Sequence, residues 1–301
     1  MHPFAQFKNL VVSEEITDVY CVFLNLVISL LGACTLPDGT HMPGSNQFLD
    51  IRSFLMERQI KLHTTLYPGG GLVQGTRPEF LDIVTNNCAT VFTNIEDVLL
   101  RVKTSIYQPV VINTELYNYV PRRCKRPIHL IFCAFNYPRK GFPLLVQAYN
   151  SLNSDDFHLH IVGDWEDQLT QITNKRFTFH GILAPEKLKL LYQRCQLFIN
   201  CSTPDHMALD GFPTTAAVDA MATGCLLVTT NPRNDHLILK DGIDYLKINT
   251  DEQSLIHTLL WIKDHFRKAK RIAVNGSRTI KARFEMTKVV TAKLAHMFGN
   301  R

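Results

Sequence analysis

The sequence predicts an α/β protein with two domains, each built around a parallel sheet. Short apolar segments alternate with helical segments along most of the 301 residues, which is the pattern of β-α-β units. A polar, basic and proline-marked stretch interrupts the alternation at residues 113–127, after which the alternation restarts. The chain is also long enough for two domains of ordinary size.

The first half opens with an apolar run, Tyr20–Cys34, that we interpret as a buried strand or helix. The run is shorter than the roughly 20 residues of a membrane span, and SEEITD precedes it where a signal peptide would be basic. A monotopic membrane anchor is the alternative. The patterns that follow predict, in order, a helix at 48–58, a strand in IKLHTTLY, a helix in RPEFLDIVTNN, a strand in ATVFTN, a helix in IEDVLLRV and a strand in IYQPVVI.

The second half has a cleaner alternation and predicts a doubly wound sheet. Strands are expected in IHLIFCAF, FHLHIVG, FTFHG, QLFINCS and CLLVTT, and helices in GFPLLVQAYNSL, APEKLKLLYQRC and TAAVDAMATG. From about Gln253 the chain is expected to be helical and basic. We place the domains at 1–118 and 119–285, followed by a C-terminal helix at 286–301.

The composition narrows the classes of partner. A formal net charge of +5 is less basic than we expect of a nucleic-acid-binding protein, but it suits an anionic substrate or an anionic membrane surface. None of the eight cysteines forms a C-x-x-C pair, so we expect no zinc site and a reducing, cytoplasmic compartment.

One stretch of the second half, Leu209–Cys225 (LDGFPTTAAVDAMATGC), holds two carboxylates separated by small residues. Pro213 can stand at the start of a helix and Gly224 at its end, so we expect a helix between them. Thr214 or Thr215 can cap this helix.

Asp210 lies in the loop ahead of that helix, and Asp219 lies on it. Thr215 and Asp219 are four residues apart and therefore share a helix face. The loop follows the expected strand QLFINCS, at the edge of the sheet where open α/β sheets bind ligands. A helix N-terminus suits phosphate, whereas carboxylates suit neutral hydroxyl groups. A nucleotide sugar carries both kinds of group, so we interpret this stretch as its binding site.

The stretch resembles the acid–x7–acid motif of retaining GT-B glycosyltransferases of the family 4 type. AFNYPRKGFPLLVQAY, HIVGDW, FTFHGILAPEKLKLLYQRCQLFINCS and LILKDGIDYLKI also follow that family's order, so the resemblance covers residues 128–248. It implies a GT-B fold, in which two Rossmann-like domains face a cleft, with a reduced first domain in this chain.

The resemblance also implies roles for individual residues. Asp210 would hold the donor sugar, next to Gly211 and Phe212 of the turn, and Asp219 the nucleotide ribose. Arg139 and Lys140 would contact the diphosphate, helped by the backbone at Thr214 and Thr215. No metal or other cofactor would be needed, because these cations and the helix end neutralise the leaving group.

The chain departs from the family pattern at three places. Both acids are aspartates where glutamate is usual, and they lie nine residues apart instead of eight. Ala134 and Phe135 stand where the family often has Gly-Arg. The first half lacks the family's early Gly-Gly loop, and only His63, at the end of IKLHTTLY, is a candidate to approach the sugar from the acceptor side. The alternative is a strand histidine with local hydrogen bonds.

The resemblance predicts a glycosyltransferase that moves a sugar from a UDP-, GDP- or ADP-linked donor to a glycan, lipid or other acceptor, with retention. The alternatives are a non-catalytic homologue acting as a binding or scaffold subunit, and another GT-B-type enzyme such as an epimerase or a phosphorylase. We expect a cytoplasmic protein that binds no nucleic acid. The basic C-terminal region is a solvated helix face or, alternatively, a surface that contacts phospholipid at the inner membrane face.

Overall fold

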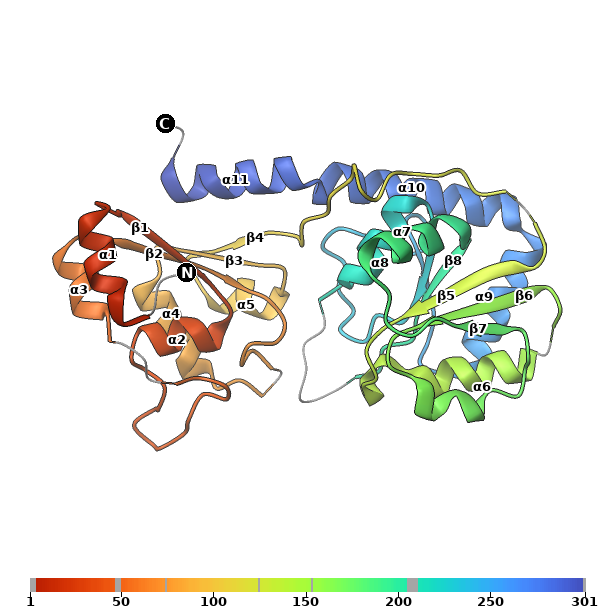
Figure 1. The fold of residues 1–301 in the computed structure, drawn as a ribbon, viewed down its shortest axis with the longest axis horizontal. Helices are drawn as coiled ribbons and strands as arrows, with labels where there is room; N and C mark the ends of the chain where they lie inside the picture. The colour runs from red at the N-terminus through yellow and green to blue at the C-terminus, as the bar shows by residue number, and fades with distance from the viewer. Residues whose placement is uncertain are drawn as a thin grey trace. The chain divides into compact units, whose positions relative to one another are not determined.

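The computed structural model describes residues 4–46, 50–73, 75–123, 125–152, 154–204 and 211–299, which divide into two compact units (Figure 1). The first unit holds the described residues up to Val110, Gly211 and those from Val289 onward. The second unit holds the remainder. The domain boundaries expected from the sequence lie after residues 118 and 285, whereas the compact units change after Val110 and Lys288.

The first unit is built on a four-stranded parallel sheet in the order β1 (Asp18–Val22), β2 (Lys61–Leu66), β3 (Thr90–Thr93) and β4 (Ser105–Tyr107). Its helices are η1 (Phe4–Gln6), α1 (Phe7–Ser13), α2 (Leu24–Leu30), α3 (Arg52–Glu57), α4 (Pro78–Asn87) and α5 (Glu96–Arg101), together with most of α11 (Met286–Phe298). Figure 1 shows α2, α4 and α5 on one side of the sheet and α11 on the other.

The apolar run at Tyr20–Cys34 is both a strand and a helix. It contains the end of β1 and all of α2, which are joined at Phe23, a residue with a φ of +76°. Leu24, Val27 and Ile28 are fully buried in the core of the first unit. No helix among the described residues is long and apolar enough to cross a membrane.

The remaining predicted elements of the first half are present, with two differences in extent. The strand expected in IYQPVVI covers only Ser105–Tyr107, since proline follows at position 109 and cannot donate to a sheet. The helix expected at 48–58 is described only as Arg52–Glu57, and residues 47–49 lie outside the described part of the chain.

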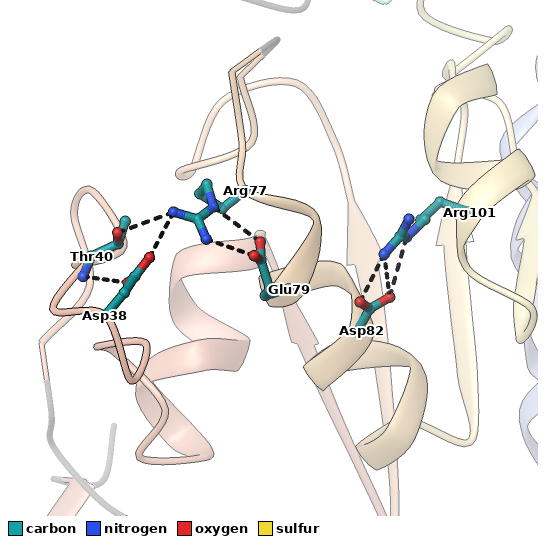
Figure 2. A network of polar contacts seen from close by, with 6 residues as sticks. All are labelled: Asp38, Thr40, Arg77, Glu79, Asp82 and Arg101. Carbon is teal, nitrogen blue, oxygen red and sulfur yellow. Dashed lines mark hydrogen bonds and ion pairs between the residues drawn. The ribbon is translucent and has the colours of Figure 1, made fainter.

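Charged side chains fasten the loop around residues 35–46 to the start of α4 (Figure 2). Arg77 contacts Asp38 at 2.8 Å and Glu79 at 2.6 Å. Hydrogen bonds from Thr40, followed by the contact with Arg77, lower the pKa of Asp38 to about 2. Nearby, Arg101 of α5 binds Asp82 of α4 at 2.7 Å, so both the start and the middle of α4 are tied to neighbouring segments.

The second unit is built on a six-stranded parallel sheet in the order β10-β9-β8-β5-β6-β7. The strands are β5 (Ile128–Cys133), β6 (Phe157–Val162), β7 (Phe177–Phe179), β8 (Leu197–Asn200), β9 (Leu226–Thr229) and β10 (Leu246–Lys247). The helices are η2 (Pro138–Lys140), α6 (Phe142–Leu152), η3 (Glu166–Gln171), α7 (Pro185–Arg194), α8 (Thr215–Thr223), α9 (Glu252–Asp264) and α10 (Phe266–Phe284). The strands and helices predicted for the second half are all present, and β10 is an addition.

The helices of the second unit cover both faces of its sheet. α6 packs with α9 on one face, and α8 packs with α7 and α10 on the other. Alternate residues of β5 and β6, such as Leu130, Phe132 and Leu159, are buried under α6 and α9. The predicted doubly wound α/β architecture is therefore confirmed.

Candidate functional site

The strand order of the second unit defines where a ligand is expected. The chain runs outward from β5 to β6 and β7 on one side, and from β8 to β9 and β10 on the other. The direction of winding therefore reverses between β5 and β8, and open α/β sheets bind ligands at the carboxyl ends of the strands at such a point. Residues 134–141 follow β5 and residues 201–204 follow β8 at this edge.

Arg139 and Lys140 lie in η2, directly after β5, and both side chains are half-buried. Gly141 follows with a φ of +71°, and a Cβ at this position would lie 1.8 Å from the carbonyl oxygen of Cys201. The backbone N–H of Thr203 also donates to the carbonyl of Arg139 at 2.8 Å. The basic pair is therefore held against the end of β8, as a loop with glycine at its tightest contact allows.

The helix predicted over TAAVDAMATG is α8, and Thr214 is its N-cap. The Thr214 hydroxyl accepts a hydrogen bond from the Ala217 N–H at 3.4 Å. Gly224 ends the helix in the left-handed conformation, with a φ of +105°, as expected. The N-terminus of α8, including Thr215, thus faces the same sheet edge and brings partial positive charge to it.

Asp219 lies half-buried on α8, and its carboxyl approaches the end of β5. Burial raises the pKa of Asp219 to about 7, although contact with the Tyr117 hydroxyl opposes the shift. Burial raises the pKa values of Cys133, the last residue of β5, and of Tyr192 on α7, and the charge of Asp219 raises both further. The structure therefore brings Asp219 to the reversal point between β5 and β8.

Tyr117 is a site residue that the sequence analysis did not identify. It lies in the stretch that we interpreted as a linker, and it is 8% exposed. The Asn113 side chain accepts hydrogen bonds from the N–H groups of Glu115 and Leu116, both at 3.0 Å, which shapes the turn before Tyr117. Asparagine at the start of such a turn is a visible sequence signal. The contact of Tyr117 with Asp219 has no such signal in the sequence, because 102 positions separate the two residues.

The turn ahead of α8 is described only in part. Asp210, the residue expected to hold the donor sugar, lies outside the described residues. Gly211 lies against Asn94, and a Cβ at Gly211 would be 2.8 Å from the Asn94 amide nitrogen. The Phe212 ring packs edge-on against Tyr245, with centroids 5.2 Å apart.

His63 was expected at the end of its strand, but it lies in the middle of β2. It is the third residue of β2, is 1% exposed, and its Nε2 lies 3.0 Å from a carboxylate oxygen of Asp18. The strand continues to Leu66, so the histidine is several residues from the carboxyl edge. This geometry fits the alternative of a strand histidine bonded to a local partner.

Among the described residues, no group of three or more histidine, cysteine, aspartate or glutamate side chains is arranged to hold a metal ion.

Comparisons with known proteins match both the fold and the part of the chain that forms this site. Residues 126–264 match the family model of the glycosyl transferases group 1. HepE from Anabaena, solved with UDP, superposes with a TM-score of 0.74 at 15% identity, over 97% of this chain and 81% of that chain. A glycosyltransferase from Rickettsia africae superposes with a TM-score of 0.73 at 13% identity, over 99% and 81% of the two chains.

The protein has a GT-B glycosyltransferase fold. Sucrose-phosphate synthase from Thermosynechococcus elongatus shares it, with a TM-score of 0.69 at 14% identity over 95% of this chain and 74% of that chain. HepE has also been solved with UDP-glucose. No curated protein matches the chain significantly. The GT-B fold expected from the sequence is therefore confirmed, and the family match falls on the second unit, where the candidate site lies.

Proposed function

We propose that the protein is a glycosyltransferase that moves a sugar from a nucleotide-sugar donor to an acceptor with retention. The observation that carries this proposal is that three features lie on the segments that follow the adjacent strands β5 and β8 of the second sheet. These features are the basic pair Arg139–Lys140, the N-terminus of α8 and the half-buried Asp219. The group 1 family match over residues 126–264 and the UDP and UDP-glucose complexes of HepE support it.

The proposed roles follow from the chemistry of each group. Arg139, Lys140 and the backbone at Thr214 and Thr215 bind the diphosphate, since cations and free N–H groups favour anions. Asp219 accepts hydrogen bonds from the ribose hydroxyls.

The donor sugar is assigned to the turn ahead of α8. Asp210 holds it, beside Gly211 and Phe212. We propose that no metal ion is required, because the basic pair and the helix end stabilise the charge that develops on the leaving diphosphate.

The experiment has a binding arm and a transfer arm. UDP, GDP and ADP, each alone and as its glucose conjugate, are screened by thermal shift. A ligand at a hundredfold excess over its Kd stabilises a protein by about 2.7 kcal/mol. Release of nucleoside diphosphate and incorporation of labelled sugar are then followed with glycan and lipid-linked acceptors. Tight binding without any transfer would contradict the catalytic proposal, and absence of binding to every nucleotide would contradict the donor class.

Lys140→Ala tests the assignment of the leaving group. Turnover is expected to fall by about 10- to 100-fold, because charge on the departing diphosphate peaks in the transition state. Affinity for the nucleoside monophosphate, which lacks the second phosphate, should change much less. Equal turnover of parent and variant would remove Lys140 from the proposed mechanism.

We further propose that the protein works in the cytoplasm, in peripheral contact with an anionic membrane. The 19 residues of α10 contain seven lysines and arginines and no acidic residue, and most of these basic side chains are exposed. Such a face is attracted to anionic lipid.

A double variant of α10, Lys268→Glu with Arg271→Glu, should abolish sedimentation with phosphatidylglycerol vesicles. The control double variant, Lys103→Glu with Lys187→Glu, changes two exposed lysines outside α10 and should not. Equal loss in both variants would indicate a net-charge effect and contradict a defined surface.

A further inference from the structure

The loop after β5 exposes two aromatic side chains next to the basic pair. Phe135 is 60% exposed and Tyr137 is 51% exposed. An aromatic side chain buries about 150–250 Å² when it finds a partner, and ligand sites are commonly lined by such rings. Two of them in the loop after β5 therefore offer apolar surface to a ligand bound at this edge of the sheet.

The residue between the two rings is firmly held. The Tyr137 N–H donates to the Phe135 carbonyl at 2.8 Å, which closes a three-residue turn around Asn136. The Asn136 backbone N–H donates to Asp164 at 2.7 Å, and its side-chain amide donates to Asp167 at 3.0 Å. The side-chain amide of Gln168 donates to the side-chain oxygen of Asn136 at 2.9 Å. The backbone that carries both rings is therefore fixed, which reduces the entropy lost when a ligand binds.

The groups around this turn select a class of ligand. Asp164 and Asp167 are exposed, and within the described part of the chain Asn136 engages one oxygen of each. Carboxylates repel phosphate but accept hydrogen bonds from hydroxyl groups. A ligand that matches both the rings and the carboxylates has an apolar face and several hydroxyls, and it is uncharged where it meets this turn.

The sequence independently favours a sugar ligand at this turn. Phe135 occupies a position at which the resemblance led us to expect arginine, two residues after the end of β5. Replacing a cation by an apolar ring removes a phosphate contact and supplies a surface for stacking. The Arg139 guanidinium covers the Tyr137 ring at 4.9 Å, so the cationic and aromatic parts of the loop adjoin each other.

We propose that Phe135 and Tyr137 form a stacking platform for the pyranose ring of a substrate, with Asp164 and Asp167 binding its hydroxyls. The proposal rests on the proposed function and deepens it, since it adds a sugar subsite to the diphosphate site. The ring belongs to the donor sugar or to the acceptor, and the experiment distinguishes the two.

The variants are Phe135→Ala and Tyr137→Ala, and Leu190→Ala is the matched control because Leu190 is an exposed apolar residue of α7. Affinities for UDP, UDP-glucose, GDP, GDP-mannose, ADP and ADP-glucose are measured by titration calorimetry. With a donor-sugar platform, both aromatic variants bind the sugar nucleotide about tenfold more weakly and the free diphosphate unchanged. With an acceptor platform, donor affinity is unchanged and KM for the acceptor rises about tenfold.

Saturation-transfer NMR with methyl glucoside, mannoside, galactoside and N-acetylglucosaminide tests the platform without any nucleotide. The parent and the Leu190→Ala control should show transfer to the ring protons of at least one pyranoside, and the aromatic variants should lose it. Parent protein that fails to bind nucleotides but retains this signal would overturn the proposed donor class and leave the platform standing. Aromatic variants that behave like Leu190→Ala in every assay, or that lose free-diphosphate binding equally, would overturn the platform.

Discussion

The Asp219 carboxyl is surrounded by groups that are neutral at physiological pH. Burial, with help from neighbouring charge, raises the pKa of Tyr117 to about 12 and that of Cys133 to about 11, and that of Tyr192 lies well above its usual value. With the pKa of Asp219 itself at about 7, its protonated and charged forms coexist near neutral pH. The free site is therefore poised between accepting and donating a hydrogen bond at this position.

Nucleotide affinity should consequently rise with pH. Ribose hydroxyls donate best to the charged carboxylate, so the Kd for the preferred nucleoside diphosphate should fall between about pH 6 and pH 8 as Asp219 loses its proton. Asp219→Asn should bind more weakly at pH 8 and flatten this dependence, which calorimetry at several pH values measures. The same pH dependence in the variant and the parent would assign the titration to another group.

The same shift makes a prediction about stability, with the sign fixed by linkage. The pKa of Asp219 rises from 3.8 to about 7 in the fold, so the folded state binds more protons between those values and loses stability as pH rises through them. Asp219→Asn removes the buried charge. It should raise the free energy of unfolding by about 1–4 kcal/mol at pH 8 and leave it unchanged near pH 3. Urea denaturation at both values tests this, and an equal difference at each would show that packing, not charge, is responsible.

Among the elements, the loop that carries the basic pair packs closely against the end of β8 at Gly141. Gly141→Ala places a Cβ 1.8 Å from the Cys201 carbonyl oxygen, at a φ of +71°. Gly181→Ala is a matched control, with a φ of +62° but no atom within 4 Å of the added Cβ. We expect a loss of about 2–4 kcal/mol in unfolding free energy for Gly141→Ala and about 1 kcal/mol for Gly181→Ala.

Weakened binding of the nucleoside diphosphate should accompany the loss at Gly141, because the displaced loop carries Arg139 and Lys140. Equal stability losses in the two variants would mean that the backbone conformation accounts for the whole effect. The contact with the end of β8 would then have no energetic role.

Helices and strands were predicted correctly where the periodicity of apolar residues agreed with the positions of proline and glycine. In the second unit, prolines at helix starts, such as Pro185, and glycines at helix ends, such as Gly224, divide the apolar runs into single elements. In Tyr20–Cys34 no glycine or proline stands between strand and helix. The chain turns there at Phe23, whose φ of +76° has no sequence signal. The run could therefore be recognised as core but not as two elements.

The candidate site was predictable to the same extent. The sequence order of strands and helices places Arg139 and Lys140 directly after β5, and Thr214 and Asp219 at and within the helix that comes after β8, and β5 and β8 are adjacent in the sheet. Tyr117 and the turn at Asn136 depend on tertiary contacts across 102 and 28 positions, and no local pattern encodes such contacts.

At the scale of the whole molecule, segments from both ends of the given sequence belong to the first unit. The residues from Val289 onward belong to the first unit. There the Lys293 ammonium donates to the Thr65 hydroxyl at 2.7 Å and to the Tyr20 hydroxyl, and it lies 4.1 Å from the Tyr20 ring centroid. The last helix thus anchors β1 and β2, which are formed by the first quarter of the sequence.

Lys293→Met should loosen this anchor without affecting the second unit. The variant keeps an apolar stem but loses the two hydrogen bonds, and we expect the first unit to lose about 1–2 kcal/mol of local stability. Hydrogen exchange should speed up at the amides of β1 and β2 and remain unchanged at those of β5 and β6, since local opening follows local contacts. Lys288→Met, an exposed lysine of the same helix, should change neither region. Faster exchange spread equally over both sheets would show that the two units open together, and would refute a local role for Lys293.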